Sequence, residues 1–172
     1  MTMTKDAYFA TGCFWGAERR FASLSGVRET SVGYMGGTQS HPTYEEVCTG
    51  RTGHAEMVHV NYDPALISYE RLLAEFWMMH DPTSLNKQGG DIGTQYRSAI
   101  YTTSDEQQRE AELSKKKYQE ALSKAGLDQI VTEILPAGGH PYYLAEEYHQ
   151  KYLVKNPDGY DCHSSTGVSY PL

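Results

Sequence analysis

The feature that most constrains this chain is the stretch GCFWG at positions 12–16. An apolar run at 7–10 predicts a strand before it, and residues 17–24 predict a helix after it, so Cys13 is expected where a strand ends and a helix begins. The unpaired N–H groups at a helix start favour an anion, and a thiol placed there loses its proton more easily. Cys13 is therefore a candidate nucleophile, although an unreactive core cysteine would fit the same pattern.

Composition and charge exclude several classes of protein. The chain has 172 residues, which suits one domain, and its formal net charge of −7 argues against nucleic acid or an anionic membrane as a partner. No apolar run is long enough to span a bilayer, and no signal-peptide pattern is expected before the first strand. The three cysteines are odd in number and far apart, which favours reactive thiols in a reducing compartment over a disulfide framework. We expect a cytoplasmic monomer with a single catalytic domain, residues 1–172.

The rest of the chain alternates between strand and helix patterns. Further strands are expected at 27–35, 57–62, 98–102 and 130–135, and helices at about 43–48, 69–79, 105–125 and 145–154. Ser68 is expected to cap the second of these helices, and Ser104 to open the third with a capping box. From about residue 156 the pattern is lost, which predicts a flexible tail that carries Cys162. Cys162 is then either a bystander or a partner that swings towards another sulfur.

Glu56 lies next to the predicted strand 57–62 and shares its apolar face. A period of two groups Glu56 with Val58 and Val60, and Met57 points to the opposite side. A carboxylate on that face must be paired or keep its proton, because burial disfavours the charged form. A glutamate that is protonated near neutral pH can act as a general acid, whereas a side chain that reaches solvent is the alternative. His54 and His59 are expected to be structural rather than metal ligands.

Two other segments offer polar candidates. Residues 83–97 have no periodicity, and loops of this length inside a domain tend to be functional. The polar side chains that this loop offers are Asp91, Gln95, Tyr96 and Arg97. Cys48 follows Tyr44 by one helical turn, so we expect the two on the same side, with packing as the role of Cys48.

Taken in their order along the chain, the motifs resemble those of a known family, the A-type peptide methionine sulfoxide reductases. The resemblance runs from Lys5 through the Cys162 region, and its matching stretches are GCFWG, VGY followed by GG, PTYEEVC, TGHAE, GGD through QYR, and EYHQKYL. It implies an α/β (α+β) two-layer sandwich, with a mixed sheet, a ferredoxin-like split βαβ core and an irregular C-terminal tail. It also implies repair of the S epimer of methionine sulfoxide.

The resemblance implies a role for each matching side chain. Cys13 would attack the sulfoxide sulfur, and Glu56 would protonate the oxygen. Tyr44 and Tyr96 would donate hydrogen bonds to that oxygen. Phe14 and Trp15 would hold the methyl group of the substrate. Asp91, the last implied substrate-binding residue, would organise the site through water. The helical spacing of Phe14 with Ala17, Phe21 and Leu24 also fits a core position, and Trp15 lies off that stripe and is the better pocket wall.

The same resemblance implies a redox cycle. Cys13 would become a sulfenic acid and then form a disulfide with Cys162, the only cysteine in the tail, which thioredoxin or another external dithiol would reopen. The substrates would be oxidised proteins and free methionine sulfoxide, with no cofactor and no metal.

Three other readings of the motifs remain open. His54-Ala55-Glu56 matches half of a zinc deaminase signature, but no Pro-Cys-x-x-Cys follows it. A cysteine hydrolase would use Cys13 as nucleophile and His54 or His149 as base. A non-enzymatic domain could bind methionine-containing peptides in the same aromatic pocket.

Overall fold

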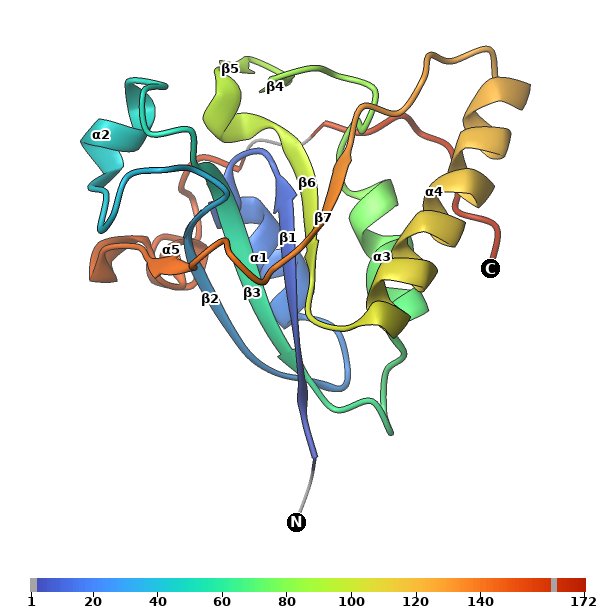
Figure 1. Cartoon of the computed structure of the whole chain (residues 1–172), viewed down its shortest axis with the longest axis horizontal. Coiled ribbons are helices and arrows are strands. Elements are labelled where there is room, and N and C mark those ends of the chain that lie inside the picture. Colours follow the sequence, from blue (N-terminus) through green and yellow to red (C-terminus); the bar gives the residue numbers. More distant parts are fainter. Residues whose placement is uncertain (1–2, 162–163) are drawn as a thin grey trace.

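A six-stranded mixed sheet forms the centre of the computed structural model, which describes residues 3–161 and 164–172 (Figure 1). Its strands in chain order are β1 (Lys5–Thr11), β2 (Val27–Met35), β3 (Ala55–Tyr62), β6 (Ser98–Thr102), β7 (Glu133–Pro136) and β8 (Tyr143–Leu144). Their spatial order is β7-β6-β1-β3-β2-β8, and every neighbouring pair is antiparallel except β6 and β7. A separate hairpin pairs β4 (Lys87–Gln88) with β5 (Asp91–Ile92).

The first three elements make a split βαβ unit. Helix α1 (Phe14–Ala22) links β1 to β2, and β3 lies between these two strands and is antiparallel to both. Strands β1 and β2 therefore run parallel without touching. Helix α3 (Tyr69–Met78) then links β3 to β6, which pairs with the free edge of β1. This strand order confirms the predicted ferredoxin-like core.

The main core lies between one face of the sheet and the helices α1, α3 and α4 (Asp105–Lys124). Trp77 of α3 is fully buried, and its indole N–H donates to Ser114 of α4 at 2.9 Å, which joins the two helices. No helix of the described ranges is both long and apolar enough to pass through a bilayer.

A smaller apolar cluster occupies the opposite face of the sheet. It consists of Ala10, Met35, Ala55, Met57, Ala99 and Tyr101, and side chains of the segment between β7 and β8 pack against it. Figure 1 shows this segment crossing in front of the sheet towards α5 (Tyr152–Lys155). The sheet is thus covered by helices on one side and by extended chain on the other.

Most predicted elements are confirmed, together with their caps. Ser68 accepts a hydrogen bond from the N–H of Arg71 at the start of α3, and Ser104 does the same for Gln107 in α4. The capping box predicted at Ser104 is not formed, because the Gln107 side chain accepts from the N–H of Thr103 at 2.9 Å. Helix α2 (Tyr44–Cys48) begins after Thr43 with a complete capping box. The predicted helix at 69–79 and the strands at 27–35 and 98–102 agree with the structure to within a residue.

The helix predicted at 145–154 is wrong. The segment follows β8 and instead forms the short 3-10 turn η2 (Glu147–His149) and then α5, with Lys151 in the left-handed region at φ 54°. The backbone N–H of Lys151 donates at 2.8 Å to Glu18 of α1, which is 2 % exposed, and the Lys151 ammonium binds the same carboxylate. These tertiary bonds replace helical ones, and they fix the turn that carries His149.

Candidate functional site

Cys13 lies at the junction of β1 and α1, as predicted. Gly12 enters this junction at φ 107°, a conformation that favours glycine, and a Cβ there would lie 2.7 Å from the side chain of Gln88. Cys13 is the N-cap residue of α1 and is partly buried. Its sulfur therefore adjoins the first turn of a helix, where backbone N–H groups favour negative charge.

Glu56 is fully buried beside this junction. It lies on β3, is 2 % exposed, and accepts a hydrogen bond at 3.1 Å from the N–H of Phe14, the residue after Cys13. Burial raises the pKa of Glu56 to about 8, a value that includes a lowering by the Phe14 hydrogen bond and a smaller increase from the charge of Asp91. Glu56 therefore holds a proton at neutral pH, and the alternative of a solvent-reaching side chain is wrong.

Two tyrosines lie within electrostatic reach of the same carboxyl group. Tyr44 is the first residue of α2, and Tyr96 ends the 3-10 turn η1 (Thr94–Tyr96). Burial raises the pKa of both phenols, and the charge of Glu56 contributes to both increases. The charges of Asp91 and Cys13 also raise the pKa of Tyr96. Both hydroxyl groups remain neutral donors across the physiological range, and both lie within electrostatic reach of Glu56.

Cys48 lies on the Tyr44 side of α2, but its predicted packing role is wrong. The Tyr44 hydroxyl is hydrogen-bonded to the Cys48 sulfur one turn later, and Cys48 is exposed. Desolvation of the sulfur raises the pKa of Cys48, and the bond from Tyr44 offsets part of that effect. The raised pKa keeps this thiol in its less nucleophilic form.

Phe14 and Trp15, the two apolar residues predicted for the site, lie in different surroundings. Phe14 is 1 % exposed and belongs to the main core, and its ring lies 5.2 Å from that of His149. Trp15 stacks on Tyr152 with a centroid distance of 3.7 Å, and its indole N–H donates to Nδ1 of His149 at 3.0 Å. The orientation of Trp15 is therefore fixed on two sides, as a pocket wall requires.

His149 and Glu146 are two residues to which sequence reasoning gave no positioning role. His149 is fully buried, and its ring contacts Phe14, Trp15 and Tyr44. Glu146 accepts hydrogen bonds at 2.8 Å from the Tyr44 N–H and from the Tyr34 hydroxyl, which fixes the start of α2. The signal for His149 was the stretch EYHQKYL at 147–153, whose geometry depends on the turn at Lys151, and Glu146 lies just before that stretch.

Neither histidine proposed as a hydrolase base has a suitable geometry. Nδ1 of His149 accepts from Trp15, and burial lowers its pKa. His54 accepts from the Gly37 N–H at 2.9 Å and bonds the Gln39 carbonyl at 2.7 Å through its other nitrogen. Both nitrogens of His54 thus hold the loop after β2, in agreement with its predicted structural role.

Asp91 connects the site to the C-terminal tail. Its Oδ1 accepts a hydrogen bond from the Tyr160 hydroxyl at 3.1 Å, and its Oδ2 is buried without a hydrogen-bond partner among the described residues. The next residue, Asp161, is ion-paired with Arg19 and Arg20 of α1. Cys162 itself lies outside the described residues.

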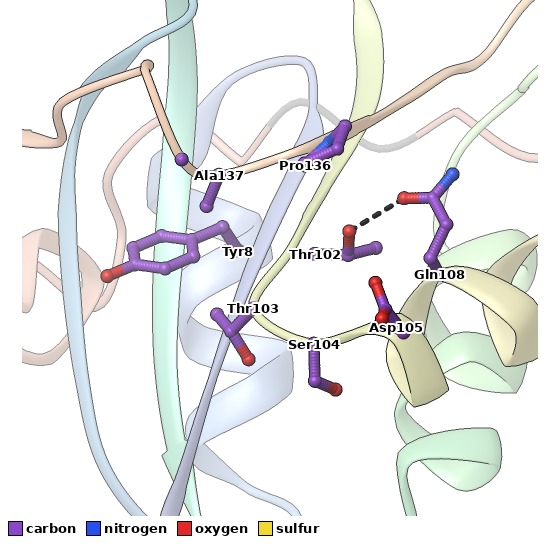
Figure 2. Close-up of a pocket in the computed structure, with 9 residues that line it drawn as sticks. Tyr8, Thr102, Thr103, Ser104, Asp105, Gln108, Pro136 and Ala137 are labelled. Carbon is purple, nitrogen blue, oxygen red and sulfur yellow. Dashed lines mark hydrogen bonds between the residues drawn. The ribbon is translucent and has the colours of Figure 1, made fainter.

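A hollow of about 470 Å³ lies in another part of the molecule, at the start of α4 (Figure 2). Tyr8, Pro136 and Ala137 line one side of it, and the Thr102 hydroxyl donates to the side chain of Gln108 at 2.7 Å on the other. None of the predicted site residues lines this hollow, and we assign no chemistry to it.

Comparison of this sequence with known proteins finds matches to one family over most of the chain. A family model described as peptide methionine sulfoxide reductase matches residues 5–170. The peptide methionine sulfoxide reductase MsrA of Vibrio parahaemolyticus is 60% identical over 160 residues, which is 93% of this chain and 74% of that protein.

Solved structures agree with the sequence comparison. Methionine sulfoxide reductase A of Corynebacterium diphtheriae has a TM-score of 0.88 and 47% identity, covering 98% of this chain and 84% of that one. Reduced Mxr1 of Saccharomyces cerevisiae has a TM-score of 0.85 and 39% identity, covering 94% and 92%. The structure of Mxr1 in complex with Trx2 has a TM-score of 0.59 at 24% identity, covering 94% and 89%.

Proposed function

Because this chain belongs to the peptide methionine sulfoxide reductase family, and is therefore an oxidoreductase, we propose that its pocket reduces the S epimer of methionine sulfoxide to methionine. One observation carries the proposal. Glu56 is a buried, protonated carboxyl group bonded to the N–H of Phe14, the residue next to Cys13. A nucleophilic sulfur beside a neutral carboxylic acid is the pair that removal of a sulfoxide oxygen requires.

In the first step, the Cys13 sulfur attacks the sulfoxide sulfur and Glu56 protonates the oxygen. The oxygen atom is transferred to Cys13, which is oxidised by two electrons to a sulfenic acid, while methionine leaves as the thioether. Tyr44 and Tyr96 donate hydrogen bonds to the oxygen as negative charge develops on it. The raised phenol pKa values support this role, because both hydroxyl groups keep their protons.

The pocket distinguishes the two epimers by three simultaneous contacts. The sulfoxide sulfur must face Cys13, its oxygen must point to Glu56 and the tyrosines, and its methyl group must lie against Trp15. Exchanging the oxygen and the lone pair breaks this fit. The fixed orientation of Trp15 between Tyr152 and His149 supports a rigid wall for the methyl group. Asp91 organises the polar side of the pocket, and its Oδ2, which is buried and has no hydrogen-bond partner in the described part of the chain, supports a contact with water.

In the second step, the Cys162 thiol condenses with the Cys13 sulfenic acid. A sulfur–sulfur bond forms, the Cys13 S–O bond breaks, and water leaves. Thioredoxin then supplies two electrons and two protons as a dithiol, and restores both thiols. The structure of yeast Mxr1 with Trx2 supports such a partner, and the bonds of Asp161 to α1 support the approach of the tail to Cys13. The whole cycle needs no prosthetic group.

The proposed substrates, oligomeric state and location are chosen to fit this cycle. We propose that residues 1–172 act as one catalytic domain, as a monomer, with oxidised proteins and free methionine sulfoxide as substrates. A cytoplasmic location is supported by the need for a compartment in which dithiols stay reduced. A domain that only binds methionine peptides would release no methionine, so turnover with a dithiol separates the two functions.

Cysteine variants test the proposal directly. With sulfoxide and no reductant, wild type and Cys162→Ser should each release a single methionine per molecule, and Cys13→Ser none. With thioredoxin, Cys162→Ser should stall, and small thiols should restore part of its turnover. Peptide mapping of the oxidised wild type should find Cys13 joined to Cys162. A Cys13–Cys48 disulfide, together with normal thioredoxin turnover in Cys162→Ser, would overturn the assignment.

A further inference from the structure

The tail residue before Cys162 is held against the first turns of α1. Both carboxylate oxygens of Asp161 are used: one pairs with Arg19, and the other lies 3.1 Å from the guanidinium of Arg20. A Cβ on Gly16 would lie 2.2 Å from the Asp161 carboxylate, so the lack of a side chain at Gly16 makes room for this contact. We call Asp161, Arg19 and Arg20 the tail clasp.

The chain is also held on the far side of Cys162. The Tyr118 hydroxyl of α4 is bonded at 2.8 Å to both the Thr166 hydroxyl and the Val168 carbonyl, and Tyr170 is buried beyond them. Figure 1 shows the tail passing from the α5 side of the molecule to α4. The described chain on either side of Cys162 is therefore fixed, on α1 before it and on α4 after it.

We propose that the tail clasp positions the tail for the recycling step, so that Asp161, Arg19 and Arg20 are positioning residues for disulfide formation. The inference rests on the proposed function of Cys162. Gly16 lies one helical turn from Cys13, and a single residue spans at most about 3.6 Å of extended chain, so an anchor at Asp161 limits how far the next residue can move away from α1. Confinement of this kind raises the effective concentration of one thiol beside another group.

The tail clasp should affect disulfide formation and leave the reduction of the sulfoxide unchanged. The ion pairs of the tail clasp join Asp161 to Arg19 and Arg20 of α1, whereas Glu56 is bonded to the N–H of Phe14. The side chains of Arg19 and Asp161 are 46% and 21% exposed, so salt should screen their attraction. Loss of the tail clasp should therefore slow disulfide formation, by roughly two- to fivefold as expected for partly exposed ion pairs.

The test follows the Cys13 sulfenic acid after a single turnover without reductant. Wild type and Asp161→Asn are mixed with sulfoxide and quenched in time; released methionine reports the first step, and the mapped Cys13–Cys162 disulfide reports the second. We expect the first rate to be unchanged and the second to fall in Asp161→Asn. Raising the ionic strength should slow wild type and leave the variant unaffected.

Three further variants keep the test specific. Asp158→Asn removes the same charge from an exposed tail position and should behave as wild type. Asp161→Glu should recover most of the rate, and Arg19→Gln combined with Arg20→Gln should repeat the Asp161→Asn defect. Equal rates of disulfide formation in wild type and Asp161→Asn would refute the positioning role of the tail clasp and leave the proposed function of Cys162 intact. If wild type forms no Cys13–Cys162 disulfide, the proposed recycling route fails, and the clasp proposal fails with it.

Discussion

Replacing Glu56 with Gln should abolish most of the reduction and, at the same time, stabilise the folded protein. Burial raises the pKa of Glu56 from its ordinary value of 4.5 to about 8, so the folded protein keeps a proton that the unfolded chain loses. When the folded pKa is the higher one, stability is present at low pH and is lost as pH rises from about 4.5 towards 8. Glutamine keeps an oxygen for the Phe14 N–H and carries no proton to lose.

The size of this effect follows from the same shift. In the interval between the two pKa values, the free energy of unfolding of the wild type falls by about 1.4 kcal/mol per pH unit relative to the variant. From pH 5 to pH 7 the stability difference between Glu56→Gln and wild type should therefore widen by roughly 2 to 3 kcal/mol in favour of the variant. Above about pH 8 both states of the wild type are ionised, and the difference should become constant.

Urea unfolding at a series of pH values, with reductant and without sulfoxide, measures this difference. Glu120→Gln is the matched control, because Glu120 is exposed on α4 and its replacement removes one charge away from the site. The control should differ from wild type by a nearly constant amount across the series. A constant difference for Glu56→Gln as well would mean that Glu56 is already ionised in the folded protein, and it could not then act as the acid.

Four shorter predictions concern catalysis. The single-turnover rate of the wild type should fall above about pH 8 as Glu56 loses its proton, whereas Glu56→Gln should be slower by about 10²–10⁴-fold and lack that fall; a wild-type rate still rising at pH 9 to 10 would contradict this. Chiral separation after incubation with both epimers of an amino-blocked methionine sulfoxide should show loss of the S epimer only, and equal loss of both would argue against the three-contact pocket. Tyr44→Phe should slow the first step by about tenfold to a hundredfold through loss of one donor, and an unchanged first step would remove Tyr44 from the site. Cys48→Ser should retain thioredoxin-supported turnover and a melting temperature close to that of wild type, because Cys48 is exposed; loss of that turnover would give Cys48 a chemical role.

The parts of the site that depend on local pattern could be predicted from the sequence. Cys13 was placed by the change from strand to helix, and Glu56 by the period of two in β3, which put it beside Val58 and Val60. Both signals lie within a few residues of the side chain that they predict. The caps at Ser68 and Ser104 could be predicted for the same reason.

The parts that depend on distant contacts could not be predicted. The segment with His149 has a helical pattern, but the buried carboxylate of Glu18 holds Lys151 in a left-handed turn and breaks the helix. No local preference reveals a partner more than a hundred positions away. The exposure of Cys48 was missed for a related reason, since a five-residue helix presents little periodicity from which to assign a buried face.

The small apolar cluster on the second face of the sheet has a consequence for how the enzyme withstands its own working conditions. An oxidant that creates methionine sulfoxide in other proteins also meets the methionines of this chain. Met35 and Met57 are at most 1 % exposed in that cluster, whereas Met3 is 76% exposed. Oxygen added to either buried sulfur would place a polar group against alanines and Tyr101 and disrupt their packing. Shielding these two side chains lets the repair enzyme keep its fold under the oxidative stress in which its substrate accumulates.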